Sequence, residues 1–221
     1  MKSKIFKMVS LFSLFLLFSF PSDHIVQARC TNVTTDISST ISLSDNNTIS
    51  ESEFLKAFTN PLNGIVGYGQ INTSTTSGSC GSHSGAVAIS YLKGLRNNVV
   101  ATRAMENAIY HIVPIAPGEG SLKNGYNSIM NKQAIPYRAV SINAREIPHY
   151  LSLGSPVVAH VHNHYVTIYG LINGRVFFSD GSHGYGTQGS IGVGAGGYLR
   201  SMSWSAFQGK MYGGYIGFAH K

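Results

Sequence analysis

The sequence predicts an α+β fold, with helices in the N-terminal half of one domain and the strands of a sheet in its C-terminal half. Apolar residues recur at helical spacing between residues 80 and 132, whereas β-branched and aromatic residues dominate short runs after residue 135. The dipeptide Asn173-Gly174 separates two of these runs and is typical of a hairpin turn. We expect one folded domain over residues 51–221, without internal repeats.

The N-terminus has the pattern of a secretory signal peptide over residues 1–28. Three lysines precede an apolar run from Met8 to Phe20, and Ala28 ends a small-residue cleavage site. The apolar run is too short to span a bilayer, and the sequence shows no other stable membrane span. We therefore expect a secreted protein, extracellular or periplasmic, after cleavage near Ala28.

Residues 29–50 are rich in serine, threonine and asparagine, so a flexible leader arm is expected there, followed by a short capped helix over residues 50–58. Without residues 1–28, which hold three lysines and Asp23, the chain has 13 basic and 8 acidic residues, a net charge of +5. The basic residues form no run and no stripe interleaved with aromatic residues. No nucleic-acid partner is therefore expected.

Three helices are expected in the N-terminal half. The first covers residues 80–96 and ends at Asn97-Asn98, the second covers residues 101–111 with a weaker pattern, and the third covers residues 120–132. In the first and third, apolar residues three and four positions apart share one face. These helices are expected to bury that face in the core.

The remaining elements alternate between short strands and turns. A β-branched run predicts a buried strand at residues 157–161, and the Asn-Gly turn predicts a hairpin of residues 164–169 and 175–179. The others are extended segments at 65–70 and 135–140, a short helix from Ser141 or Asn143 to 153, a glycine-rich loop at 181–197, a helical turn at 203–207 and a strand at 214–219.

Cys80 lies where a loop of small residues becomes the first turn of the first helix. Free N–H groups and the positive end of the helix dipole lie at such a position, and both favour the thiolate, the reactive form of cysteine. The other cysteine, Cys30, falls in the expected arm, so we expect Cys80 to be unpaired. The pattern predicts a nucleophile, and a cysteine that merely packs the start of the helix is the alternative.

A nucleophilic cysteine needs a base, a group that orients the base and a donor for the oxyanion. His164 begins an apolar strand, and Asp180 is the only aspartate after Asp45. In the expected hairpin both lie near the same end, where a carboxylate fixes the tautomer of an imidazole. Gln70 is a candidate oxyanion donor together with the Cys80 backbone N–H.

Two other groups of histidines compete with this interpretation. His83 lies three residues after Cys80 and is a rival base, but it shares the helix with the cysteine and leaves little room for substrate. His160, His162 and His164 would share one face of a straight strand and could hold zinc or copper. A tight turn at His162-Asn163 would break that face.

Six segments together resemble the papain-like cysteine peptidases, and among them the bacteriocin-processing, double-glycine leader peptidases and their secreted stand-alone relatives. The segments are Tyr68-Gly69-Gln70, Ser79-Cys80-Gly81, Gly154–Val158, His164–Gly170, Val176–Asp180 and Met202–Phe207. The resemblance implies a papain-like fold whose N-terminal helices, including the nucleophile helix, pack on a C-terminal antiparallel sheet. It also implies Cys80 as nucleophile and His164 as base. Asp180 would then orient the base, and Gln70 would be the oxyanion glutamine.

The chain departs from the family at two points. Ser82-His83-Ser84 stands where the family often has proline or alanine, and Gly181 follows Asp180 where the family often has proline. We expect a secreted cysteine hydrolase, a peptidase that cleaves a peptide or isopeptide bond of a peptide or protein substrate through an acyl-enzyme, without cofactor or metal. The alternatives are an acyltransferase and a non-catalytic binding or toxin-like module on the same fold.

Overall fold

The structure is a computed structural model that describes residues 61–72, 78–114, 118–162, 164–182 and 198–221. The expected signal peptide, leader arm and helix at residues 50–58 lie outside these ranges, as do residues 183–197 of the expected glycine-rich loop. Among the described residues, none of the helices has the length and apolar character needed to cross a membrane.

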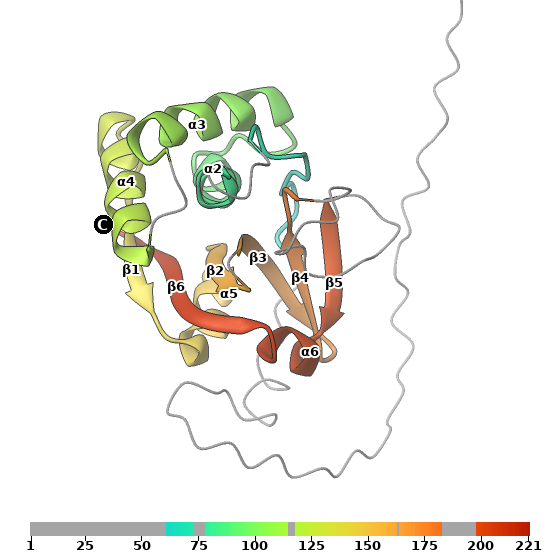
Figure 1. The fold of residues 1–221 in the computed structure, drawn as a ribbon. Helices are drawn as coiled ribbons and strands as arrows, with labels where there is room; N and C mark the ends of the chain where they lie inside the picture. The colour runs from blue at the N-terminus through green and yellow to red at the C-terminus, as the bar shows by residue number, and fades with distance from the viewer. Residues whose placement is uncertain (1–60, 73–77, 115–117, 163, 183–197) are drawn as a thin grey trace, which may run out of the picture. The chain divides into compact units, whose positions relative to one another are not determined.

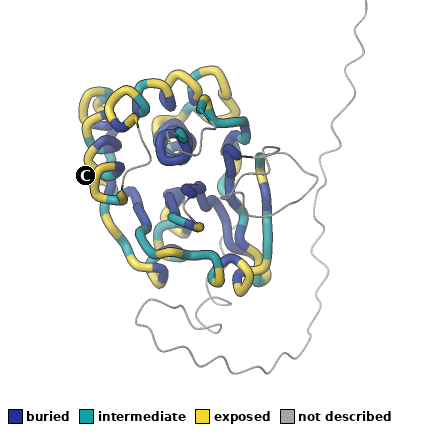
Figure 2. The backbone as a smooth tube through the Cα atoms, viewed as in Figure 1, coloured by how far each residue is buried: buried dark blue, intermediate teal, exposed yellow. Residues whose placement is uncertain are grey.

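Three helices form one layer of the domain: α2 (Cys80–Leu92), α3 (Val99–Ile112) and α4 (Glu119–Lys132). Figure 1 shows α2 end-on between the other two helices and the sheet. Every residue of α2 from Cys80 to Tyr91 is buried, which the dark blue tube in Figure 2 makes visible. The predicted helices are confirmed, although α2 ends earlier than expected because Gly94 takes a left-handed φ of +84° that closes the helix.

Two glycines of α2 let α4 approach its backbone closely. A Cβ at Gly81 would meet the side chain of Leu122, and a Cβ at Gly85 would meet the ring of Tyr126. The hydroxyl of Tyr126 donates a hydrogen bond to the Gly81 carbonyl at 2.5 Å. The tyrosine therefore packs closely against the helix that carries Cys80 and bonds to its backbone.

Gly85→Ala is expected to lower the free energy of unfolding by about 2 kcal/mol, since the new methyl group overlaps the fully buried ring of Tyr126. Urea denaturation measures this change. Gly120→Ala is the matched control, because its Cβ would meet no atom within 4 Å and alanine favours the helix. Equal midpoints for the two variants would contradict the close packing of α2 on α4.

The second layer is a six-stranded sheet in the order β1-β6-β2-β3-β4-β5, in which all neighbouring strands are antiparallel. The strands are β1 (Tyr137–Ile142), β2 (Val157–Val161), β3 (His164–Ile172), β4 (Arg175–Ser179), β5 (Leu199–Ser203) and β6 (Met211–His220). The short elements η1 (Ala144–Glu146), α5 (Ile147–Ser152) and α6 (Trp204–Gln208) complete the fold. The expected α+β class is thus confirmed: helices pack on an antiparallel sheet.

Apolar side chains cover both faces of the sheet, which explains the continuous apolar run of β2. Val157 and Ala159 belong to a core with α5 and α6, whereas Val158 belongs to a second core with the α2–α4 layer. Because successive side chains of a strand point to opposite faces, both sets are buried. The sheet is therefore held rigidly between two layers.

The strands differ from expectation at the edges of the domain. The hairpin of β3 and β4 forms across Asn173-Gly174 as predicted, with Thr167 opposite Ser179. The segment 65–70 is not a strand, although it lies along the end of β4, where Ser179 Oγ donates to the Val66 carbonyl at 3.1 Å. Strand β5, which pairs with β4, is not predicted from the sequence because Leu199–Ser203 has no β-branched residue.

Candidate active site

Cys80 is the first residue of α2, directly after the N-cap residue Ser79, and its thiol is free and buried. The position matches the expectation from the sequence. The carbonyl of Ser84 accepts a hydrogen bond of 2.8 Å from Thr167 Oγ1, which fixes the first turns of α2 to strand β3. The fold thus holds the helix start at the end of β3 that begins with His164.

The β3–β4 hairpin brings His164 and Asp180 together from opposite ends of 16 residues of chain. His164 begins β3, Asp180 follows the last residue of β4, and both side chains are buried. His164 Nε2 donates to Asp180 Oδ1 at 2.9 Å. This contact leaves Nδ1 as the ring nitrogen that faces a thiol partner.

Three further groups hold the carboxylate of Asp180. The backbone N–H and the hydroxyl of Ser182 donate to Oδ1 at 2.9 and 2.8 Å. On the other side, Arg200 Nη1 of strand β5 lies 3.4 Å from Oδ2 in a buried ion pair. Burial raises the pKa of Asp180, but the hydrogen bond and charge of His164 and the contacts of Ser182 outweigh it and lower the pKa to about 2. The carboxylate is therefore ionised throughout the neutral range.

The electrostatics of Cys80 and His164 favour an ion pair. Burial raises the pKa of Cys80, yet the hydrogen bond and charge of His164, with the backbone N–H groups of Tyr165 and Gly81, outweigh burial and lower it. Burial lowers the pKa of His164, whereas its hydrogen bonds with Asp180 and Cys80 raise it to about 9. Both shifts favour thiolate and imidazolium near neutral pH.

Gln70 lies near the start of α2, and its side chain bonds to the Asn72 carbonyl and not to Cys80. Its Nε2 donates to the Asn72 carbonyl at 2.6 Å, and the same oxygen accepts the Ser79 N–H at 2.9 Å. The Gln70 amide and the N–H of Ser79, the residue before Cys80, therefore converge on one oxygen. A second N–H of Nε2 remains for another acceptor.

His83 bonds to a backbone carbonyl, whereas His164 bonds to Asp180, so His83 does not take the place of His164. The ring is completely buried, and Nε2 lies 3.0 Å from the Tyr68 carbonyl, to which it donates. Burial, the largest cause, lowers the pKa of His83 to about 4, so the ring is neutral at physiological pH. The ring also packs against Gly181, where a Cβ would come within 2.9 Å of it.

The three histidines of the competing metal hypothesis do not share a strand face. Strand β2 ends at Val161, His162 has a left-handed φ of +40°, and β3 begins at His164. The ring of His160 stacks on the ring of Tyr165, with 4.6 Å between the ring centroids. Within the ranges that the structure describes, no group of three or more histidine, cysteine or acidic side chains is placed to hold a metal ion.

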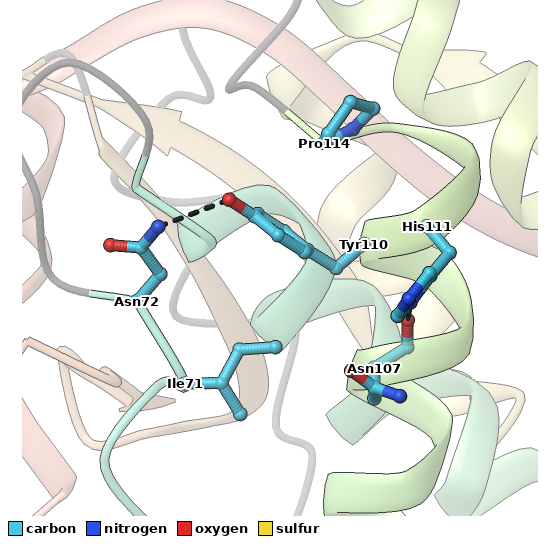
Figure 3. Close-up of a pocket in the computed structure, with 6 residues that line it drawn as sticks. All are labelled: Ile71, Asn72, Asn107, Tyr110, His111 and Pro114. Carbon is cyan, nitrogen blue, oxygen red and sulfur yellow. Dashed lines mark hydrogen bonds between the residues drawn. The ribbon is translucent and has the colours of Figure 1, made fainter.

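A cavity of about 490 Å³ opens on the α3 side of residues 71 and 72. Its lining residues are Ile71, Asn72, Asn107, Tyr110, His111 and Pro114 (Figure 3). In Figure 3 the Tyr110 hydroxyl accepts a hydrogen bond of 3.0 Å from Asn72 Nδ2. Cys80, His164 and Asp180 do not line this cavity.

The sequence interpretation missed three residues of the site. Ser182 was part of a recognisable Asp-Gly-Ser turn, in which a serine commonly bonds to the aspartate. Glu106 of α3 falls on the same helix face as the buried residues Thr102 and Ile109, a signal for a buried carboxylate. Nothing in the sequence indicates that Arg200 is buried, because arginine is usually a surface residue and the strand that carries it is not predicted.

Comparisons with known proteins find a likeness in solved structures. A scan against models of protein families and a search of curated proteins give no match. One similar structure is a double glycine motif protease from an AMS/PCAT transporter in complex with the leader peptide, at 12% identity and a TM-score of 0.44, covering 74% of this chain and 97% of that chain. Another is the peptidase domain of Streptococcus ComA, a bifunctional ABC transporter of a quorum-sensing pathway, at 18% identity and a TM-score of 0.42, covering 68% of this chain and 96% of that chain.

Both solved structures are peptidases of the kind that the sequence resemblance names, although the overlaps are loose, with TM-scores below 0.5. The identities are low, so the likeness does not extend to the roles of single residues.

Proposed function

We propose that the protein is a cysteine hydrolase that cleaves a peptide or isopeptide bond of a peptide or protein substrate. Cys80 is the nucleophile, His164 the base and Asp180 the group that orients the base. We also propose that the protein is exported after removal of residues 1–28. The observation that carries the proposal is the buried pair of His164 and Asp180, joined at 2.9 Å from Nε2 to Oδ1, together with the influence of His164 that lowers the pKa of Cys80.

The proposed reaction uses Cys80, His164 and Asp180 in turn. The Cys80 thiolate attacks the carbonyl carbon at the positive end of the α2 dipole, while the Cys80 N–H and Gln70 Nε2 donate to the developing oxyanion. His164 gives its Nδ1 proton to the leaving amine, and a water that His164 deprotonates then hydrolyses the acyl-enzyme. Asp180 keeps Nε2 protonated throughout, so the same nitrogen always faces the reaction.

The test is the pH dependence of Cys80 alkylation by iodoacetamide, followed by mass spectrometry. Because the His164 imidazolium persists to a pKa of about 9 and the pKa of Cys80 is lowered, we expect fast alkylation already at pH 6. A free thiol with a pKa of about 8.5 would have little thiolate there. His164→Ala is expected to slow alkylation at pH 6 by at least about tenfold, with a smaller effect at pH 9.

His111→Ala is the control, since His111 lies on the exposed side of α3 and bonds to the Asn107 carbonyl. A peptide library incubated with the wild-type protein and with Cys80→Ala then reveals the bonds that are cleaved. Alkylation that is slow at pH 6 and unchanged by His164→Ala would contradict the proposed pair and favour a binding module on the same fold.

A further inference from the structure

Glu106 is a buried carboxylate that no step of the proposed reaction uses. It belongs to α3, and its side chain is completely buried in the domain. Burying a carboxylate is costly unless hydrogen bonds replace its hydration. Oε1 accepts the Ile71 N–H at 2.8 Å and the Ser79 hydroxyl at 2.9 Å.

These two donors come from the two sides of the proposed oxyanion site. Ile71 directly follows Gln70, and Ser79 directly precedes Cys80. One carboxylate oxygen therefore joins the segment that carries the side-chain donor to the residue that precedes the nucleophile.

A second set of contacts closes the same junction. The Asn72 N–H donates to Ser79 Oγ at 3.0 Å, and the Ser79 N–H donates to the Asn72 carbonyl at 2.9 Å. The Asn72 carbonyl also accepts Gln70 Nε2. The position of the Gln70 amide relative to the start of α2 thus depends on Ser79, and Ser79 is held by Glu106.

We propose that Glu106 is a positioning residue that fixes residues 70–72 against the start of α2 and thereby sets the geometry of the oxyanion site. This inference rests on the proposed hydrolase function. It assigns separate carboxylates to the two halves of the site: Asp180 holds the base, and Glu106 holds the oxyanion donors.

Two reactions of Cys80 separate these roles. Iodoacetamide alkylates the thiolate with loss of iodide and forms no oxyanion, so it reports the Cys80–His164 pair alone. p-Nitrophenyl acetate acylates Cys80 through a tetrahedral oxyanion and releases p-nitrophenolate, so it also reports the oxyanion site. Glu106→Leu is expected to lower kcat/KM for p-nitrophenyl acetate by about 30-fold and to leave the alkylation rate and its pH profile within about threefold.

The conservative variant distinguishes positioning from bulk packing. Glu106→Gln keeps an oxygen that accepts the Ile71 N–H and the Ser79 hydroxyl, so it is expected to retain kcat/KM within about threefold. Glu146→Gln is the matched control, because Glu146 lies in the cap before α5 and glutamine preserves that cap. Ser79→Ala serves where Glu106→Leu fails to fold, and it is expected to lower kcat/KM about fivefold with unchanged alkylation.

The outcomes separate the two proposals. If Glu106→Leu and Ser79→Ala slow alkylation and acylation equally, or slow neither reaction, the proposed role of Glu106 is wrong. The hydrolase proposal survives that result as long as Cys80 of the wild-type protein reacts with both reagents. A wild-type Cys80 that reacts with neither reagent contradicts the hydrolase itself, and the role of Glu106 with it. Loss of acylation alone, with recovery in Glu106→Gln, supports the inference.

Discussion

Asp180→Asn is expected to slow turnover of p-nitrophenyl acetate by about 10³-fold, although asparagine has almost the same shape as aspartate. In the wild-type protein Oδ1 accepts from His164 and Ser182, while Oδ2 faces Arg200. The amide of asparagine has one oxygen, which can face either His164 and Ser182 or Arg200, but not both. If that oxygen stays with His164, the NH₂ group points at the guanidinium of Arg200, and two donors oppose each other.

The opposite orientation satisfies Arg200 but harms the base. The NH₂ group then donates to His164 Nε2, which must give up its proton, so the proton moves to Nδ1 and the ring no longer accepts a proton from Cys80 there. The loss of the correct tautomer costs up to about 10⁴-fold in enzymes that depend on such an aspartate. Each orientation thus turns the NH₂ group toward a fixed donor, either the Ser182 N–H or the Arg200 guanidinium, so neither reproduces the contacts of the carboxylate.

The same substitution is expected to lower the free energy of unfolding by about 3 kcal/mol at pH 7, because Arg200 loses a buried carboxylate. The folded-state pKa of Asp180 is about 2, below the usual 3.8, so the carboxylate stabilises the fold above about pH 4 and loses this effect as the pH falls through 2. The difference between wild type and variant should therefore narrow in acid.

Urea denaturation at pH 7 and pH 3 and the rate of p-nitrophenolate release measure both effects. Arg200→Met in the Asp180→Asn background is the matched control, since it removes the charge that conflicts with the amide and should restore part of the stability and rate. An Asp180→Asn protein that keeps wild-type stability and activity would contradict the ion pair and the orienting role of Asp180.

The main elements of this fold were predictable because they depend on short-range patterns. The β3–β4 hairpin follows from Asn173-Gly174, and α2 follows from the apolar spacing after Cys80. His164 and Asp180 could be placed at one end of the hairpin from that turn alone. The contact between His164 and Asp180 is therefore predictable from the local sequence of the hairpin.

Contacts that depend on the packing of distant elements could not be predicted in this way. Arg200 meets Asp180 because β5 pairs with β4, and nothing in Leu199–Ser203 indicates a strand. Glu106 meets Ile71 and Ser79 because α3 packs beside α2 in a particular register. Such contacts follow from the tertiary arrangement, so the residues that hold the site in place were harder to find than those that carry its chemistry.

Gly181→Ala is expected to slow turnover of p-nitrophenyl acetate by about 100-fold, since residue 181 links both halves of the site. A Cβ at this position would lie 2.9 Å from ring atoms of His83, and that ring is completely buried. Gly181 directly follows Asp180, and its carbonyl accepts the Gln70 N–H at 3.0 Å. A shift of this residue therefore displaces the carboxylate and the Gln70 segment together, and a displacement near 1 Å costs about 100-fold.

His83 and Gly181, the two positions at which the sequence departs from the family that it resembles, depend on each other because they are in contact. The imidazole occupies the space in which any larger residue after Asp180 would place its Cβ. The φ of Gly181 is outside the left-handed region, so alanine is excluded by the histidine and not by the backbone. Removing the ring should consequently make alanine acceptable.

The double variant His83→Ala/Gly181→Ala tests this coupling. We expect it to recover at least about tenfold of the activity lost in Gly181→Ala, whereas independent effects would multiply and lower the rate further. Gly209→Ala is the matched control, because its Cβ would meet backbone atoms only at ordinary distances of 3.7 Å or more. A double variant no more active than Gly181→Ala would show that the ring of His83 does not set the residue after Asp180, and that the clash is relieved by movement elsewhere.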